Sequence, residues 1–267
     1  MAEMNTNTAE LLQQMIDIKR DMRAAIGNKG VTVVSGMESY PSAIDSIQQD
    51  IVGGASKLTD GTKFKGSTFT TIPQFDTSAM TDMSKMFYEC HNLTTIPQLD
   101  TSNVINMDDM FNWCDALTTI PQLDTSNVMF MDHMFTSCYD LVSIPQLDTS
   151  NVINMDYIFS SCYSLTTIPQ LDTSNVMYMD QMFSGNYNLK DLGGFINLGS
   201  KLIGTNAVLD FNNSNLLTTT SVLNVFNTIA NVGTTKTCTI RLHQDVLNTL
   251  SADDIAIATG KGWTVRT

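Results

Sequence analysis

"LDTSNVINMDDMFNWCDALTTIPQ", residues 99–122, is followed at once by "LDTSNVMFMDHMFTSCYDLVSIPQ", residues 123–146, and the two stretches share one 24-residue pattern. The pattern occurs five times in succession without an insertion. Three apolar residue types keep the step in every copy: Ile72, Ile96, Ile120, Ile144 and Ile168; Phe87, Phe111, Phe135, Phe159 and Phe183; Leu93, Leu117, Leu141, Leu165 and Leu189. A short fixed period with apolar residues in phase predicts a solenoid, in which each unit buries its apolar side only by stacking on its neighbours.

Each repeat is expected to contain a strand, a turn and a helix. The segment that ends at Pro97 alternates apolar and polar residues as a short strand does, and the proline ends it at a bend. Asp100, with the threonine and serine after it, favours a turn or a helix cap. In residues 104–114 the apolar residues are three and four positions apart, which predicts a short helix. The fold class is therefore α/β, with rungs about 4.8 Å apart.

The chain is expected to divide into four parts. Residues 1–54 form an N-terminal helical segment for anchoring or oligomerisation, residues 55–69 an N-terminal cap, residues 70–189 the solenoid, and residues 190–267 a C-terminal α/β cap. Caps are expected because an open solenoid end exposes apolar side chains and unpaired backbone groups.

The N-terminal segment carries an amphipathic pattern in residues 8–26. Its apolar stripe follows a spacing of four and three residues, at Leu11, Met15, Ile18 and Met22. The stripe is about two heptads long, too short for a stable isolated helix, so it should pack on another surface. That surface is either the rest of the same chain, or other copies and other proteins; a homotrimer is the favoured oligomer.

After the repeats, strand and helix patterns continue to alternate. We expect strands at "AVLDF", "TCTIRL" and "WTVR", a helix over Thr218–Ile229, and helical turns over Gln244–Leu250 and Ala252–Thr259. The alternation continues where the sequence repeat stops, as in a terminal cap.

The charge of the chain excludes some classes of partner. Residues 70–189 hold fourteen acidic side chains and a single basic one, Lys85, which equals the whole net charge of −13. Nucleic acid is not an expected ligand of such a surface. No apolar run is long enough for a membrane span. The first residues, "MAEMNTNTAELLQQM", lack the charged start and apolar stretch of a signal peptide, so secretion by that route is not expected.

Four of the five cysteines share one position of the repeat: Cys90, Cys114, Cys138 and Cys162, with Asn186 in the fifth copy. We expect them to be reduced and buried as packing residues. Disulfides between rungs and a metal site are the alternatives, although no C-x-x-C pair is present.

Two rows of aspartate are candidate sites. The first, Asp76, Asp100, Asp124, Asp148 and Asp172, is expected to cap turns, with a line of Ca²⁺ ions as the alternative. The second, Asp108, Asp132, Asp156 and Asp180, is expected to face solvent or to cap a helix turn. The three histidines, His91, His133 and His243, share no motif. We therefore expect neither an enzyme nor a cofactor.

The positions that vary between repeats favour aromatic residues. They include Trp113, Phe130, Tyr139, Tyr157, Tyr163, Tyr178 and Tyr187. If these side chains point outward, rings and nearby carboxylates form a face suited to a sugar or a protein ligand. The alternative is that they pack along the solenoid.

The motif "LDTSNVxxMDxMFxxCxxLTTIPQ", over Thr70–Leu189, resembles the BspA-type leucine-rich repeats of Mycoplasma and Bacteroidetes surface proteins. This resemblance implies a right-handed solenoid similar to leucine-rich repeats (LRR-like), with roles in adhesion or protein binding and without catalytic residues. The glycine usual in the family before the cysteine is replaced by Glu89, Trp113, Ser137 and Ser161.

The two ends of the chain carry a second resemblance. The opening "LLQQMIDIKRDMRAAIGNKGVTVVSGMESYPSAIDSI" resembles N-terminal segments of phage tail, baseplate and head-fibre proteins, including those of crAss-like phages. The closing "LTTTSVLNVFNTIAN" through "LSADDIAIATGKGWTV" resembles the end module of repeat proteins in phages and gut bacteria. This implies a virion protein, a tail or capsid fibre or spike, that displays the solenoid to a host-surface protein or glycan. A bacterial cell-surface adhesin and an intracellular scaffold or assembly protein are the alternatives.

Overall fold

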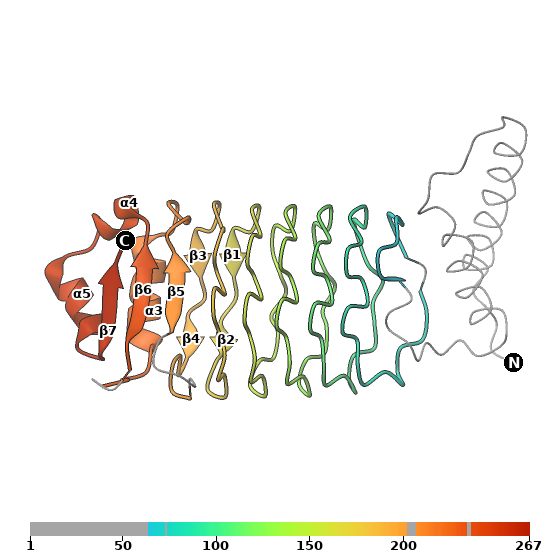
Figure 1. Ribbon diagram of the computed structural model, residues 1–267, viewed down its shortest axis with the longest axis horizontal. Helices are drawn as coiled ribbons and strands as arrows, with labels where there is room; N and C mark the ends of the chain where they lie inside the picture. The colour runs from blue at the N-terminus through green and yellow to red at the C-terminus, as the bar shows by residue number, and fades with distance from the viewer. Residues whose placement is uncertain (1–63, 73, 202–206, 234–235) are drawn as a thin grey trace, which may run out of the picture.

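The repeats form rungs that lie one behind another along the long axis of the molecule (Figure 1). The structure is a computed structural model, and it describes residues 64–72, 74–201, 207–233 and 236–267. The C-terminal strands and helices close one end of the row of rungs.

The N-terminal expectations fall outside the described residues. They concern the segment 1–54, with the helix of Leu11, Met15, Ile18 and Met22, and residues 55–63 of the expected N-terminal cap. In the described part of the chain, none of the helices has the length and apolar character that crossing a membrane requires.

Backbone hydrogen bonds join each repeat to the next on more than one side of the rung. On one side an N–H donates to the carbonyl 24 residues earlier: Thr94 to Thr70 at 2.9 Å, Thr118 to Thr94 at 3.4 Å, Val142 to Thr118 at 3.2 Å and Thr166 to Val142 at 3.1 Å. On another side, parallel β-bridges link Asp82, Asn106, Phe130, Asn154 and Tyr178 in turn. The 24-residue step of the sequence is thus the hydrogen-bond register of the stack.

The short helix expected in each repeat does not form. Along residues 83–90, alternate N–H groups donate to the next repeat: Met83 to Asn106, Lys85 to Asp108, Phe87 to Met110 and Glu89 to Asn112, at 2.8 to 2.9 Å. Of the N–H groups between them, that of Ser84 donates to Oδ1 of Asp82, and the others donate three residues back: Met86 to Met83, Tyr88 to Lys85 and Cys90 to Phe87. The segment is therefore a series of tight turns whose remaining N–H groups bond to the neighbouring rung.

Backbone dihedral angles also exclude a helix here. Lys85 and Glu89 have φ of 59° and 60°, and the same two positions have positive φ in each later repeat, ending with Gln181 and Gly185. A right-handed helix cannot contain residues in the left-handed region. The helix prediction was wrong because apolar residues three and four apart also fit a turning segment with its core-facing side chains at those positions.

A column of phenylalanine rings fills the centre of the stack. Successive ring centroids from Phe87 to Phe183 lie 5.5 to 6.1 Å apart, and all five side chains are fully buried. Phe64 packs on the first ring at 5.6 Å, and Phe211 on the last at 4.9 Å. Identical apolar residues therefore form a continuous buried column, as the repeat predicts.

The cysteine row lies beside this column, and the expectation of reduced, buried cysteines is confirmed. Three Sγ atoms donate to a phenylalanine carbonyl oxygen 27 residues earlier: Cys114 to Phe87 at 3.0 Å, Cys138 to Phe111 at 3.1 Å and Cys162 to Phe135 at 3.0 Å. Sγ of Cys90 donates to the carbonyl oxygen of Phe64, 26 residues earlier, at 2.9 Å. In the fifth repeat Nδ2 of Asn186 makes the same bond to Phe159, at 3.0 Å. The one exception in the row thus keeps the hydrogen bond that the thiols make.

The stack continues for one rung beyond Leu189. β1 (Thr167–Ile168) pairs in parallel with β3 (Asp191–Leu192), and β2 (Leu171–Asp172) pairs in parallel with β4 (Phe195–Ile196). The 24-residue register is kept in both pairs, although the sequence motif has stopped.

Gly193 permits this extra rung to stack. A Cβ at this position would lie 2.3 Å from the backbone nitrogen of Gln170 in the rung before it. No side chain fits there, so glycine stands where the earlier repeats have proline.

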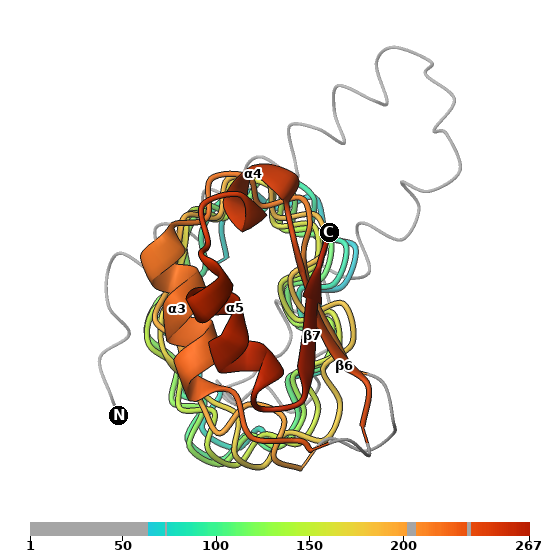
Figure 2. The same ribbon diagram turned by 90° about the vertical axis from the view of Figure 1, so that its left-hand side faces the viewer.

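The C-terminal region combines a parallel sheet with helices. Its strands are β5 (Val208–Phe211), β6 (Cys238–Leu242) and β7 (Trp263–Arg266), in that spatial order. Its helices are α3 (Thr219–Thr228), α4 (Gln244–Leu247) and α5 (Ala252–Thr259). Figure 2 shows α3 and α5 on one side of the cross-section, β6 and β7 on the other, and α4 at one end. The strands and helices expected in this region are confirmed, with α4 ending three residues early.

Candidate functional site

One row of rings runs along the surface of the stack, and we name it the aromatic row: His91, Trp113, Tyr139, Tyr163 and Tyr187. Neighbouring ring centroids in it lie 4.6 to 6.3 Å apart. Trp113, Tyr163 and Tyr187 are 40%, 39% and 50% exposed, so the row faces solvent for most of its length.

The rings of the aromatic row do not all offer the same surface. Tyr139 and Tyr163 stack at 4.6 Å with an angle of 11° between their planes, so they cover each other's faces. Trp113 stands edge-on to Tyr139, at 81°, and Tyr187 is tilted by 59° from Tyr163. The middle of the row therefore offers ring edges and hydroxyl groups, while uncovered ring faces lie at its two ends.

The other aromatic residues expected on the ligand face lie elsewhere. Tyr157 stacks on His133 at 4.7 Å, and its hydroxyl accepts a hydrogen bond from Gln181 at 3.0 Å. Phe130 and Tyr178 lie in the row of residues that form β-bridges between rungs. They are two rungs apart, and Asn154 occupies the rung between them. The structure thus brings together four of the seven residues and places three in two other rows.

At one end of the aromatic row a carboxylate takes the place of a tyrosine. Oδ2 of Asp115 lies 2.9 Å from Nδ1 of His91. Its Oδ1 is buried and has no hydrogen-bond partner among the described residues. A buried acceptor without a donor is energetically costly, and the burial of this oxygen also keeps it from a ligand on the surface.

Trp113 stands at a backbone position that suits glycine. Its φ is 63°, and the equivalent positions Glu89, Ser137 and Ser161 have φ of 59° to 60°, while the fifth repeat has Gly185 there, at 80°. Left-handed backbone costs a non-glycine residue about 1 kcal/mol. This requirement explains the glycine usual before the cysteine in BspA-type repeats, and the chain keeps the strained conformation to carry side chains instead.

A second exposed row was missed by the sequence reasoning. We name it the outer apolar row: Ile105, Met129, Ile153 and Met177, joined by N–H to carbonyl bonds of 2.8 to 2.9 Å. Ile105 is 44% and Met129 39% exposed. Each residue directly follows a buried valine, and its position was not among those predicted for the ligand face. The signal that remained was a large apolar residue at a position that varies between repeats.

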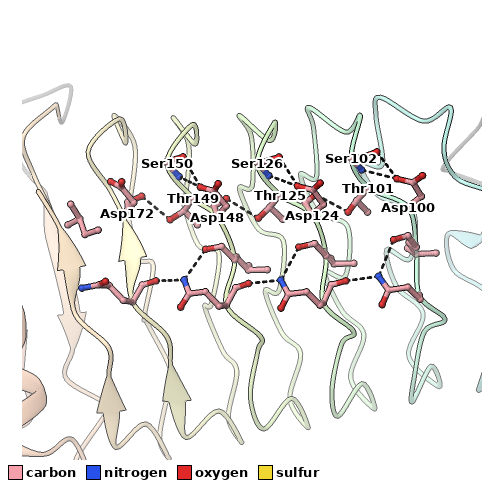
Figure 3. Close-up of a pocket in the computed structure, with 18 residues that line it drawn as sticks. Asp100, Thr101, Ser102, Asp124, Thr125, Ser126, Asp148, Thr149, Ser150 and Asp172 are labelled. Atoms are coloured by element: carbon pink, nitrogen blue, oxygen red, sulfur yellow. Dashed lines mark hydrogen bonds between the residues drawn. The ribbon is translucent and has the colours of Figure 1, made fainter.

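A shallow groove of about 790 Å³ runs along the first row of aspartates (Figure 3). Oδ1 of Asp100 accepts hydrogen bonds from N–H and Oγ of Ser102, at 3.1 and 2.7 Å, and Asp124 and Asp148 repeat this arrangement. These two bonds from Ser126 hold the pKa of Asp124 below its usual value. The expected turn-capping role of these aspartates is confirmed.

Glutamine amides follow the other side of the groove. Nε2 of Gln98 donates to the carbonyl oxygens of Gln122, at 2.6 Å, and Leu99, at 3.2 Å, and Gln122 and Gln146 do the same one repeat later. The donors along the groove are thus used within the stack, and oxygen acceptors remain. The described residues contain no cluster of three or more histidine, cysteine, aspartate or glutamate side chains able to hold a metal ion.

The second row of aspartates does not cap helix turns. Oδ1 of Asp108 accepts the N–H of Asp132 in the next repeat at 3.0 Å, and Oδ1 of Asp156 accepts the N–H of Asp180 at 2.6 Å. Burial, followed by the neighbouring Asp132, raises the pKa of Asp108 to about 8. Burial also raises the pKa of Asp156. The row therefore links rungs, and the carboxyl groups of Asp108 and Asp156 retain protons more readily than exposed aspartates do.

The thiol groups are unsuited to nucleophilic chemistry. Burial raises the pKa of Cys162 to about 12 and that of Cys138 well above its usual value. A thiol in such surroundings stays protonated at neutral pH, and the thiolate is the nucleophilic form.

Comparison with known families gives one match. The sequence model of the family described as "Mycoplasma protein of unknown function, DUF285" matches residues 56–166 and 139–197. The two matches span residues 56–197, or 142 of the 267 residues of the chain, and include all five repeats. They support the BspA-type character of the repeats. No curated protein matches the chain.

Proposed function

The chain belongs to the family described as Mycoplasma protein of unknown function, DUF285, and we propose that it is a non-enzymatic binding module. In this proposal the five repeats form an LRR-like solenoid that holds its ligand along the aromatic row. The observation that carries the proposal is the continuous contact of five exposed or half-exposed rings across five repeats. Aromatic side chains that a fold leaves in water are common at the centres of protein and sugar recognition sites.

The surroundings of the row define the class of ligand. Residues 70–189 carry a strong negative charge with Lys85 as their one base. Asp115 adds a further carboxylate at the Trp113 end, where its Oδ2 lies 2.9 Å from Nδ1 of His91. An uncharged or cationic ligand rich in hydrogen-bond donors fits such a surface, whereas an anionic ligand is repelled. A host-surface glycan or protein meets the first description.

The location of the binding module is a separate part of the proposal. We place it on a virion, as a tail or capsid fibre or spike, because of the resemblance of both chain ends to phage proteins. The segment 1–54 then attaches to other virion proteins and joins the copies, three being the favoured number. A bacterial cell-surface adhesin uses the same solenoid and is the alternative that the BspA-type family favours. An intracellular scaffold is the third candidate.

Loss of the aromatic row tests the binding function. The triple variant Tyr139→Ser, Tyr163→Ser and Tyr187→Ser removes three of its rings, and binding is measured on an array of neutral and acidic oligosaccharides and on immobilised bacterial surface extract. We expect the bound signal to fall about tenfold or more, since each ring contributes about 0.5–1.5 kcal/mol of contact.

The matched control removes as many side chains from the outer apolar row. The variant Ile105→Ser, Met129→Ser and Ile153→Ser should keep the binding of the unchanged protein. Equal binding by the unchanged protein and the aromatic-row variant would refute the proposal. Light scattering on the pure protein tests the location separately, because a stable monomer counts against a fibre.

A further inference from the structure

A second hollow lies where the fifth repeat meets the C-terminal region. It has a volume of about 440 Å³, and we name it the junction pocket: Tyr187, Asn212, Asn213, Asn215, His243, Gln244 and Thr267. Small-molecule sites in proteins commonly measure about 300–1,000 Å³. The junction pocket lies at the last ring of the aromatic row, where a ring face is uncovered, and Tyr187 is 50% exposed.

Buried hydrogen bonds fix the loop that carries the three asparagines. Oγ of Ser214 donates to the carbonyl oxygen of Asn186 at 2.8 Å, directly beside Tyr187, and Ser214 is fully buried. The N–H of Asn212 donates to Oδ1 of Asp210 at the end of β5, at 3.0 Å. The loop is therefore anchored to the repeat that supplies the ring, and the pocket is formed before any ligand arrives.

The polar groups of the junction pocket are largely uncommitted. The side-chain amides of Asn212, Asn213 and Asn215 make no hydrogen bond to any described residue, and each offers two donors and an acceptor. Nδ1 of His243 accepts the N–H of Asp245 at 3.2 Å as the N-cap of α4. The neutral ring then carries its proton on Nε2, which is left to donate to a ligand.

We propose that the junction pocket binds one neutral sugar unit, such as a terminal hexose of a glycan. A pyranose ring has an apolar face that packs on an aromatic ring, and its hydroxyl groups both donate and accept hydrogen bonds, as amides do. Among the described residues that line the pocket, none is an aspartate, glutamate, lysine or arginine. The polar side chains of the pocket are amides, hydroxyls and an imidazole, and such groups suit the hydroxyl groups of an uncharged ligand. The inference rests on the proposed binding function, because Tyr187 belongs to both surfaces.

The test measures binding of simple neutral sugars to the full chain. The probes are the methyl glycosides of glucose, galactose, mannose and N-acetylglucosamine at millimolar concentration, detected by saturation-transfer NMR. We expect at least one probe to bind, and the variant Asn213→Ala with Asn215→Ala to weaken it about tenfold, since each lost hydrogen bond accounts for a factor of about three to ten. Methyl glucuronide, in which a carboxylate replaces the C6 hydroxymethyl group, should bind more weakly than methyl glucoside.

The matched control removes two asparagines from α3. Asn224 and Asn227 are exposed and do not line the pocket, so Asn224→Ala with Asn227→Ala should leave sugar binding unchanged. Failure of all four neutral probes, equal losses in both double variants, or tighter binding of the glucuronide overturns the inference.

A variant that spares the pocket separates this inference from the proposed function. Tyr139→Ser with Tyr163→Ser changes the aromatic row and leaves Tyr187 and the asparagines in place. If this variant loses binding to the array, and the neutral probes do not bind the unchanged protein, the proposed function is supported and the sugar pocket is refuted. If this variant keeps its binding to the array, and the asparagine double variant loses the neutral probes, the sugar pocket is supported and the aromatic row is not the binding surface.

Discussion

The repeats and the C-terminal region satisfy their backbone groups in different ways. In residues 83–90, and at the same positions of later repeats, alternate N–H groups donate to carbonyl oxygens 23 residues later, in the next repeat. In the C-terminal region α3 and α5 form helices with their own N-caps, Thr218 and Ser251. The last rungs have no identical neighbour beyond them, so their elements must satisfy more of their own backbone groups. In the repeats, hydrogen bonds between neighbouring copies thus take the place of the bonds within a helix.

The largest expected effect comes from breaking the phenylalanine column. Phe135→Ala removes a ring that packs at 5.5 Å on Phe111 and at 5.8 Å on Phe159. We expect a loss of about 3–5 kcal/mol in the free energy of unfolding. Because each repeat touches only its neighbours, the urea transition followed by circular dichroism should also become broader. Phe226→Ala, in the buried face of α3, is the control: it should leave the repeats folded as the C-terminal region unfolds. A loss below about 1 kcal/mol for Phe135→Ala would contradict the columnar core.

A smaller effect is expected from pH. The folded state raises the pKa of Asp108 to about 8, above the usual value near 3.9 in an unfolded chain. A raised pKa stabilises the protein at low pH, and this stabilisation is lost as the pH rises through the folded-state value. We expect the free energy of unfolding to fall by about 1–2 kcal/mol between about pH 5 and pH 9, with solvent screening reducing the effect of the full shift.

The variant Asp108→Asn should flatten this pH dependence, measured by urea unfolding across the same range. Asp124→Asn is its control, since hydrogen bonds from Ser126 lower rather than raise the pKa of Asp124. If the free energy of unfolding of Asp108→Asn still falls steeply with rising pH, other titrating groups cause the effect.

A still smaller change in stability is expected at two positions with left-handed backbone, Ser137 and Gly185. Ser137, at a φ of 59°, should gain about 0.5–1 kcal/mol of stability on replacement by glycine. Gly185, at 80°, should lose a similar amount or more on replacement by alanine, because its Cβ would lie 3.1 Å from Oγ of Ser161. The thermal unfolding midpoint should rise in Ser137→Gly and fall in Gly185→Ala. Shifts of the same sign would show that the two positions are not equivalent.

The smallest effect is expected from restoring the regular residue of the cysteine row. Asn186→Cys keeps a donor for the carbonyl oxygen of Phe159 and removes the amide Oδ1, which is buried and lacks a partner among the described residues. The free energy of unfolding should change by less than about 0.5 kcal/mol or rise, whereas Asn186→Ala should cost about 1–2 kcal/mol. Denaturation of both variants measures the difference. A cost for cysteine as large as that for alanine would show that the thiol does not replace the amide.

Parts of the candidate site were predictable from the sequence. The variable position that holds Tyr139, Tyr163 and Tyr187 predicts a line of rings, because equivalent positions of stacked repeats are neighbours. Trp113 stands two positions earlier in its repeat than these tyrosines do in theirs, and only the coordinates place it beside Tyr139. The junction pocket was not predictable at all, because a loop after β5 and the start of α4 meet the fifth repeat there.

The sequence by itself determined the 24-residue register, the buried columns and the elements after Ala207, because each depends on the periodicity or capping of nearby residues. Only the tertiary structure decided that residues 83–90 and their equivalents form turns rather than helices. Apolar spacing fits both forms, and the choice depends on which carbonyl each N–H meets. In this chain that carbonyl lies in the next repeat, and the left-handed φ of Lys85 and Glu89 brings the N–H to it.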